Sequence, residues 1–172
     1  MIIWFTGVPG SGKSTLSEKL AQVVGERGYS VHCVDGDTFR EREKRKNTFS
    51  REEIIANNLR IIEYIQSISE KYDVIIVSVI SPFQETREKA RELFGQNLRE
   101  IFLDCPRDVL IARDPKGLYA KALRGEITNL IGFSPLSPYE RPEKPDLMIQ
   151  TDKVYVDSAI VTIMDSFFHG NT

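Results

Sequence analysis

The chain has 172 residues, of which 41% are hydrophobic and 28% are charged, values typical of one globular domain over residues 1–172. Its 23 basic and 25 acidic residues give a net charge of −2, so no basic excess indicates binding to nucleic acid or to a membrane surface. The longest apolar stretch, 74–80, is far too short to span a bilayer, and no leader-like segment begins the chain, which predicts a cytoplasmic protein.

Apolar runs typical of strands alternate with helical patterns along the chain. Strands are predicted at 2–5, 30–34, 74–80, 100–103 and 147–150, and helices at 13–26, 51–70, 84–95, 107–112, 116–124 and 157–168. This alternation predicts an α/β fold, a parallel five-stranded sheet flanked by helices. Cys33 and Cys105 lie in strand-like runs and are expected to be small buried residues rather than a disulfide or a zinc site.

The link between the first strand and the first helix carries a complete G-x-x-x-x-G-K-[ST] sequence, residues 7–14. Its glycines let backbone N–H groups point inward, and with the helix N-terminus they form a cradle for anionic oxygens. The strand before it and the helix after it distinguish a phosphate-binding loop from a chance glycine-rich turn. The loop therefore predicts binding of a nucleoside triphosphate. The predicted contacts are Gly7, Pro9, Gly10, Ser11, Gly12, Lys13, Ser14 and Thr15, with Lys13 on the β- and γ-phosphates and Ser14 on Mg²⁺.

Two carboxylates, Asp35 and Asp37, follow the second predicted strand, at the sheet edge where open α/β folds bind ligands. One could organise Mg²⁺, and the other could accept a proton from an attacking hydroxyl or orient it. The alternative interpretation is an Asx turn that closes the strand. No acidic residue follows the central strand and no Asn-Lys-x-Asp sequence occurs, which favours a small-molecule kinase over a GTPase.

Residues 113–146 are predicted to form a lid or acceptor-binding loop, because 127–146 is rich in proline and breaks the helical pattern. Arg113 and Lys116 at its start could close over a transferring phosphoryl group. The same segment also fits a turn that begins a helix, with Asp114 as the cap. The mixed-charge run 40–46 is interpreted either as a solvated helical turn or as a rim that steers anions.

Together these motifs resemble the adenylylsulfate kinase (APS kinase) family over residues 3–153. The strings Asp114-Pro115-Lys116-Gly117-Leu118-Tyr119 and Ile80-Ser81-Pro82 are specific to that family, whereas the phosphate loop alone is not. Further matches are Asp35-Gly36-Asp37-x-x-Arg40, Phe49-Ser50, Asn57-x-x-Arg60 and Pro138-Tyr139-Glu140-x-Pro142. The resemblance implies a P-loop kinase that transfers the γ-phosphoryl group of ATP, with Mg²⁺, to the 3′-hydroxyl of a small nucleotide, adenylyl sulfate. It also admits a homodimer.

The resemblance further implies roles for single residues. Asp37 would be the base or the orienter, Lys13 would act on the transferred group, and Lys116 would bridge the donor and acceptor phosphates. Arg113 would contact ATP. Acceptor contacts are implied for Asp35, Asp37, Arg40, Phe49, Asn57, Ile80, Ser81, Lys116 and Leu130, and metal contacts for Ser14 and Asp35.

Departures from the family pattern all fall on the acceptor side. Ile54 stands where the family usually has an arginine for the acceptor's anionic group, and Leu130 where it usually has a second aromatic against the base. A second hypothesis is therefore the same reaction on another nucleotide, such as cytidine diphosphoramidate. A third, a nucleotide-binding regulator without catalysis, is disfavoured because Lys13, Ser14, Asp37 and Lys116 are all present.

Overall fold

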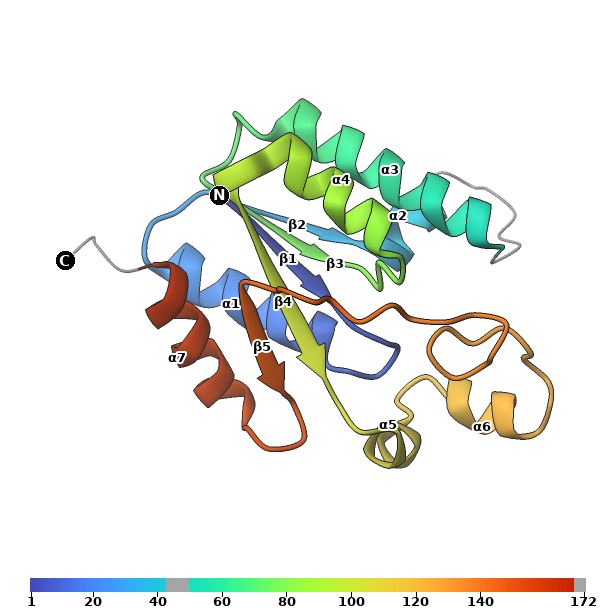
Figure 1. Cartoon of the computed structure of the whole chain (residues 1–172). Coiled ribbons are helices and arrows are strands. Elements are labelled where there is room, and N and C mark those ends of the chain that lie inside the picture. Colours follow the sequence, from blue (N-terminus) through green and yellow to red (C-terminus); the bar gives the residue numbers. More distant parts are fainter. Residues whose placement is uncertain (43–49, 169–172) are drawn as a thin grey trace.

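The computed structural model describes residues 1–42 and 50–168. Its centre is a five-stranded, all-parallel sheet of order β2-β3-β1-β4-β5, with helices on both faces (Figure 1). The strands are β1 (Ile2–Thr6), β2 (Val31–Asp35), β3 (Val74–Ser78), β4 (Leu98–Asp104) and β5 (Leu147–Gln150). The predicted α/β fold with a parallel five-stranded sheet is confirmed.

The described helices follow the predicted pattern with one addition. They are α1 (Lys13–Glu26), α2 (Gly36–Arg42), α3 (Arg51–Ile68), α4 (Gln84–Phe94), α5 (Arg107–Arg113), α6 (Leu118–Leu123) and α7 (Val156–Phe167), with a 3-10 turn at Gly95–Asn97. The short α2 was not predicted, and α6 begins two residues later than expected because Gly117, at φ 66°, turns the chain just before it. Across the described residues, no helix has both the length and the apolar character that a membrane span requires.

Strand β1 divides the interior into two cores, because successive side chains of a strand point to opposite faces. Ile3 and Phe5 pack among α1 and α7, whereas Ile2 and Trp4 pack among α3 and α4. All four side chains are at most 3% exposed. Burial of β1 and its neighbour β3 on both faces holds their carboxyl ends in place, and the phosphate loop, Ile80 and Ser81 follow those ends.

The two cysteines differ from each other. Cys105, just after β4, is buried as predicted, but Cys33 is exposed, so its predicted burial is wrong. Strand β2, which carries Cys33, lies at the edge of the sheet, where covering by helices is incomplete. Both thiols are free.

Candidate active site

The phosphate loop joins β1 to α1 at the carboxyl edge of the sheet (Figure 1). Gly10 and Gly12 have φ angles of 78° and 96°, in the left-handed region that favours glycine, so the loop curls back on itself. Within the described part of the chain, the buried Ser11 hydroxyl has no hydrogen-bond partner. Ser14 and Thr15 are exposed in the first turn of α1. This curled loop before a helix N-terminus has the form of a phosphate cradle.

The side chain of Lys13 bends back over this loop. Its ammonium group donates hydrogen bonds to the carbonyl oxygens of Gly7 (2.8 Å) and Val8 (2.9 Å). Burial lowers the pKa of Lys13 to about 7, although the charge of Asp37 opposes that effect. A bound phosphate would supply the negative charge that the two carbonyl dipoles provide only in part.

The two predicted carboxylates have different environments. One oxygen of Asp35 accepts hydrogen bonds from the backbone N–H groups of Asp37 (3.0 Å) and Thr38 (3.1 Å), so the Asx turn is present and begins α2. The Asp37 carboxylate pairs with Arg40 through one oxygen and accepts from Lys116 Nζ at 2.6 Å through the other.

The charge state of Asp37 follows from these contacts. Burial acts to raise its pKa, but hydrogen bonds and charge from Lys116 and Arg40 outweigh burial and hold the pKa below its usual value. Asp37 is therefore ionised at neutral pH. A carboxylate with a lowered pKa is a weak base, so this arrangement is better suited to orienting a hydroxyl than to deprotonating it early.

The first residues of the lid segment (113–146) make contacts in two directions. Arg113, at the end of α5, donates to the carbonyl oxygen (2.6 Å) and the hydroxyl (3.1 Å) of Thr151, just after β5. Lys116 reaches Asp37 at the start of α2. Between them, the Asp114 carboxylate accepts from two backbone N–H groups of α6, at 3.0 and 2.8 Å. The N-cap of α6 is Gly117, however, so the prediction of Asp114 as the cap is wrong.

Two contacts between the lid segment and the phosphate loop were not predicted. The Tyr119 hydroxyl, on α6, donates to the Pro9 carbonyl at 2.7 Å. The backbone at Gly132 lies so close to the Val8 side chain that a Cβ would be 2.4 Å from Val8 Cγ1. Tyr119 ends the family-specific string, and that position was the signal that could have identified it.

Of the predicted acceptor residues on α3 and after β3, Asn57 and Ser81 are buried and Ile80 is partly buried. Asn57 is 8% exposed, and in the described residues its Oδ1 atom has no hydrogen-bond partner. The hydroxyl of Ser81 is committed to the interior, since it accepts from Trp4 Nε1 and donates to Asn58 Oδ1, both at 3.0 Å. Phe49 and residues 43–46 of the charged run lie outside the described residues.

The two departures from the family pattern, Ile54 and Leu130, are core residues. Ile54 is 8% exposed and packs with Phe83 and Ile131, with Ile80 at the margin of the cluster. Leu130 is 6% exposed and packs with Cys105, Leu110 and Tyr119. Apolar packing therefore occupies position 54, where the family usually has a charged side chain.

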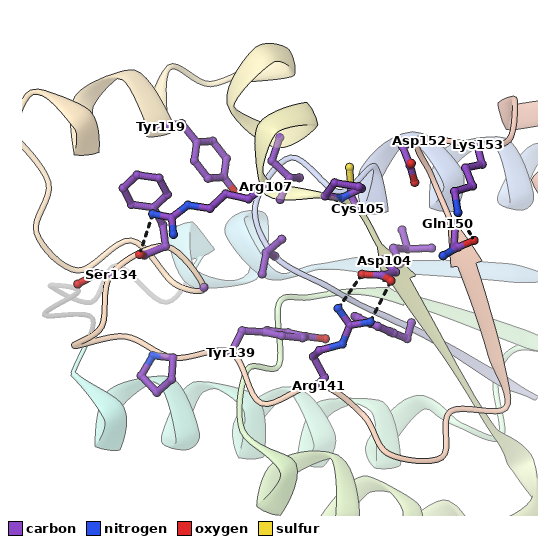
Figure 2. A pocket seen from close by; sticks show the side chains of 18 of the residues that line it. Asp104, Cys105, Arg107, Tyr119, Ser134, Tyr139, Arg141, Gln150, Asp152 and Lys153 are labelled. Atoms are coloured by element: carbon purple, nitrogen blue, oxygen red, sulfur yellow. Dashed lines mark hydrogen bonds and ion pairs between the residues drawn. The ribbon is translucent and has the colours of Figure 1, made fainter.

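A cavity of about 610 Å³ lies between the carboxyl ends of β4 and β5, the start of α5 and the lid segment (Figure 2). On one side, Arg141 donates two hydrogen bonds of 2.9 Å to the Asp104 carboxylate. On the other, Arg107 lies over the Phe133 ring, 4.0 Å from its centroid. From the phosphate loop the cavity includes Val8, but it does not include Lys13, Asp37 or Lys116. It therefore lies beside the predicted transfer site.

Comparison with known proteins gives a consistent result. A family model described as adenylylsulphate kinase matches residues 1–150. An adenylyl-sulfate kinase of Chloroflexus aurantiacus is 46% identical over 153 residues, covering 88% of this chain and 80% of that protein. One of Clostridium acetobutylicum is 38% identical over 164 residues, covering 95% and 81%. The solved structure of the Mycobacterium tuberculosis APS kinase CysC in complex with AMPPNP and APS has a TM-score of 0.87 at 33% identity, covering 97% of this chain and 96% of its own. The chain belongs to the adenylylsulphate kinase family.

Proposed function

We propose that this chain is an ATP-dependent kinase that transfers the γ-phosphoryl group to the 3′-hydroxyl of adenylyl sulfate, forming 3′-phosphoadenylyl sulfate. The observation that carries the proposal is the 2.6 Å contact between Lys116 of the lid segment and Asp37 at the start of α2. The charges of both residues act on Lys13 of the phosphate loop, so the three groups share one site. Family membership supports the choice of substrates, and a relative was solved with AMPPNP and APS.

In this proposal Asp37 accepts a hydrogen bond from the 3′-hydroxyl and directs its oxygen at the γ-phosphorus. The new O–P bond forms as the bond between the γ-phosphorus and the β–γ bridging oxygen breaks, and the hydroxyl proton passes to Asp37. Lys13 and Lys116 stabilise the charge that spreads over the phosphoryl oxygens. Residues Gly7 to Thr15 cradle the phosphates, and Arg113 contacts the nucleotide beside Thr151.

We propose that the Mg²⁺ ion that accompanies ATP is held by Ser14 and Asp35. In the described residues, no group of three or more His, Cys, Asp or Glu side chains could hold a metal. Mg²⁺ bound to a nucleotide needs few protein ligands, because phosphate and water oxygens complete its octahedron. Exposed Ser14 lies in the first turn of α1, and Asp35 pairs in register with Ser78 at the carboxyl edge of the sheet, so a hydroxyl and a carboxylate of suitable chemistry are present. When bound, the ion neutralises phosphate charge.

The acceptor is proposed to lie against α2 and α3. Arg40 supplies positive charge beside Asp37, and the unpaired Oδ1 atom of Asn57 can accept from a donor on the nucleotide. A buried acceptor without a partner costs free energy, which a ligand that supplies the missing hydrogen bond regains. Ile80 and Ser81 line the same side, Leu130 contributes from within the lid segment, and Phe49 is proposed to stack on the base.

The test is ADP release from MgATP with adenylyl sulfate and with cytidine diphosphoramidate, supplied in parallel. We expect turnover with adenylyl sulfate, and a loss of about 10²- to 10⁴-fold in kcat for Asp37→Asn. Asp157→Asn is the matched control, because Asp157 is an exposed carboxylate on α7, 87% accessible. Turnover with the cytidine compound alone would replace the proposed acceptor, and tight ATP binding without any turnover would favour a regulator.

A further inference from the structure

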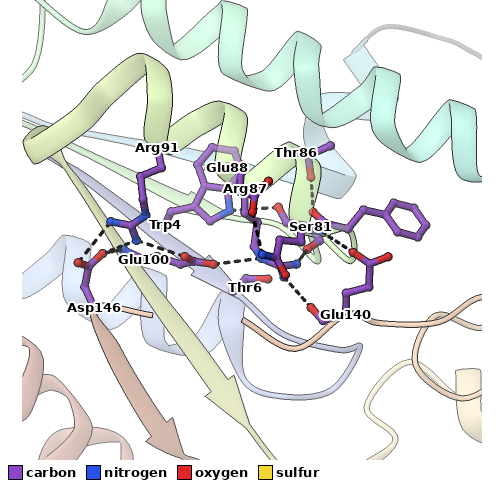
Figure 3. A network of polar contacts seen from close by, with 12 residues as sticks. Trp4, Thr6, Ser81, Thr86, Arg87, Glu88, Arg91, Glu100, Glu140 and Asp146 are labelled. Atoms are coloured by element: carbon purple, nitrogen blue, oxygen red, sulfur yellow. Dashed lines mark hydrogen bonds and ion pairs between the residues drawn. The ribbon is translucent and has the colours of Figure 1, made fainter. Parts of the chain in front are cut away.

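Arg87, in the first turns of α4, is a buried arginine with three partners. It is 4% exposed. Its Nη1 donates to the Ser81 carbonyl oxygen at 2.5 Å, its Nη2 donates to the Glu140 carbonyl oxygen at 2.7 Å, and its Nε lies 3.1 Å from Glu100 Oε1 in an ion pair. Figure 3 shows the guanidinium group among these groups. The partners belong to the loop after β3, to β4 and to the stretch Tyr139–Glu140, which we call the returning limb of the lid segment. One side chain therefore connects three separate parts of the chain.

The contact with Ser81 holds an unusual backbone. Ser81 has a φ angle of 44°, in a region that residues other than glycine seldom adopt. Such a conformation persists only where surrounding contacts determine it. The carbonyl oxygen is held by Arg87, while the hydroxyl lies between Trp4 and Asn58. Asn58 is the neighbour on α3 of Asn57, the proposed acceptor contact.

The contact with Glu140 is one of several that join the lid segment to the same loop. The Glu140 N–H donates to the Pro82 carbonyl oxygen at 2.8 Å, and the Glu140 carboxylate accepts from the Gln84 N–H at 2.7 Å. One residue earlier, the hydroxyls of Tyr139 and Thr6 lie 2.8 Å apart in a hydrogen bond. Glu140 is therefore attached to Pro82 and Gln84 through backbone and side-chain atoms, and Tyr139 is attached to the end of β1.

The contacts of residue 87 with Ser81, Glu140 and Glu100 require the side chain of an arginine. A guanidinium presents five donors in a planar fork, so it can serve two carbonyl oxygens and a carboxylate at once, which an ammonium group on a flexible stem does less well. Its buried charge is balanced by Glu100, which is itself 6% exposed. Arg91, one helical turn further, also pairs with Glu100 (3.2 Å) and with Asp146 (2.8 Å). Among the described residues, Arg91 contacts neither the Ser81–Pro82 loop nor Tyr139–Glu140; it meets the lid segment at Asp146, the last residue of that segment.

We propose that Arg87 is a positioning residue for the acceptor nucleotide: it fixes the Ser81–Pro82 loop against the Tyr139–Glu140 limb, and thereby the acceptor-side wall, without touching either substrate. Its loss weakens acceptor binding and leaves MgATP binding intact, because the phosphate loop and Lys13 make none of these contacts. The expected change in acceptor binding rests on the proposed kinase function. The position of the Ser81–Pro82 loop does not depend on that function.

The test compares Arg87→Lys with the matched control Arg91→Lys, which makes the same substitution in the same ion-pair network. The only tryptophan, Trp4, donates to Ser81 Oγ, so its emission reports on the loop without any ligand. We expect Arg87→Lys to shift the Trp4 emission and to raise the KM for adenylyl sulfate at least about tenfold, with the Kd for MgATP within about twofold. Arg91→Lys is expected to leave the Trp4 emission, the KM for adenylyl sulfate and the Kd for MgATP unchanged.

A parallel loss of MgATP affinity in Arg87→Lys, or the same pattern in Arg91→Lys, would refute the positioning role. If the wild-type protein does not turn over adenylyl sulfate, the proposed function fails. The Trp4 emission spectra of the two variants then test the positioning role of Arg87 by themselves. A shift that occurs only in Arg87→Lys supports that role, and identical spectra of the two variants overturn it. If Arg87→Lys does not fold, Glu140→Ala removes the acceptor for the Gln84 N–H at an exposed position. It should raise the KM for adenylyl sulfate about threefold with MgATP affinity unchanged, and an unchanged KM overturns the proposal.

Discussion

At the residue scale, Lys13 couples nucleotide binding to pH. Burial lowers its pKa to about 7 in the absence of nucleotide, so at pH 8 most molecules carry a neutral amine. A triphosphate beside the amine raises the pKa again. We therefore expect MgATP binding at pH 8 to take up a proton, and the affinity to fall as the pH rises above 7. Titration calorimetry in two buffers of different ionisation enthalpy measures the uptake.

The control for this prediction is Lys13→Arg, because a guanidinium stays protonated throughout this pH range. Its MgATP binding should be weaker but should take up no proton at pH 8. Binding to the wild-type protein without proton uptake at pH 8 would show that Lys13 is already charged in the free protein, contrary to the effect of burial.

At the scale of elements, the lid segment meets the phosphate loop at Gly132. Its φ angle is 74°, and a Cβ there would lie 2.4 Å from Val8 Cγ1. Gly125 has nearly the same φ, 75°, but a Cβ there meets nothing within 4 Å. We expect Gly125→Ala to lower the free energy of unfolding by only the left-handed penalty, about 1–2 kcal/mol. Gly132→Ala should cost more and should also raise the KM for MgATP, because the stiff valine side chain must move.

Urea unfolding and ATP kinetics on the two alanine variants separate these effects. Since the two glycines have nearly the same φ angle, the difference between the variants measures the effect of the close contact between Gly132 and Val8. Equal losses of stability with equal KM values would show that the close approach at Gly132 has no part in nucleotide binding.

At the scale of the whole molecule, the sheet is a shared wall between two cores, since alternate residues of β1 and β3 enter each of them. We therefore expect one cooperative thermal transition for the predicted single domain. MgATP at 100 times its Kd should stabilise the protein by about 2.7 kcal/mol and raise the Tm by about 5–10 °C for a chain of this size. Scanning calorimetry with and without MgATP measures both quantities.

Lys13→Ala provides the control for this shift. Its transition should remain single, and most of the increase in Tm with MgATP should disappear, because the ammonium group is the main cation of the loop. Two resolved transitions, with only one that responds to MgATP, would divide the chain into independent units and contradict the single-domain prediction.

Much of the fold was predictable because its patterns are local. The five strands were each found within two residues of their ends, as apolar runs between helical patterns. Helix α2 was missed because it is short and depends on one cap, Asp35. Burial of Cys33 was mispredicted because an edge strand has the same composition as a central one. At the candidate site, Lys13 and Asp37 could be named in advance, but Tyr119 and Arg87 could not be ranked above other residues of their helices.

The amino-acid sequence by itself determined the phosphate loop, the alternation of strands and helices, and the family, because each depends on residues that are neighbours along the chain. Only the tertiary structure decided that Lys116 meets Asp37, 79 positions away, and that Arg87 joins the loop after β3 to the limb of the lid, 53 positions away at Glu140. It also decided that Ile54 is packed in the core. These relations arise from how α2, α3, α4 and the lid segment pack over the sheet, and the free energy of that packing is shared among many residues rather than encoded in any short pattern.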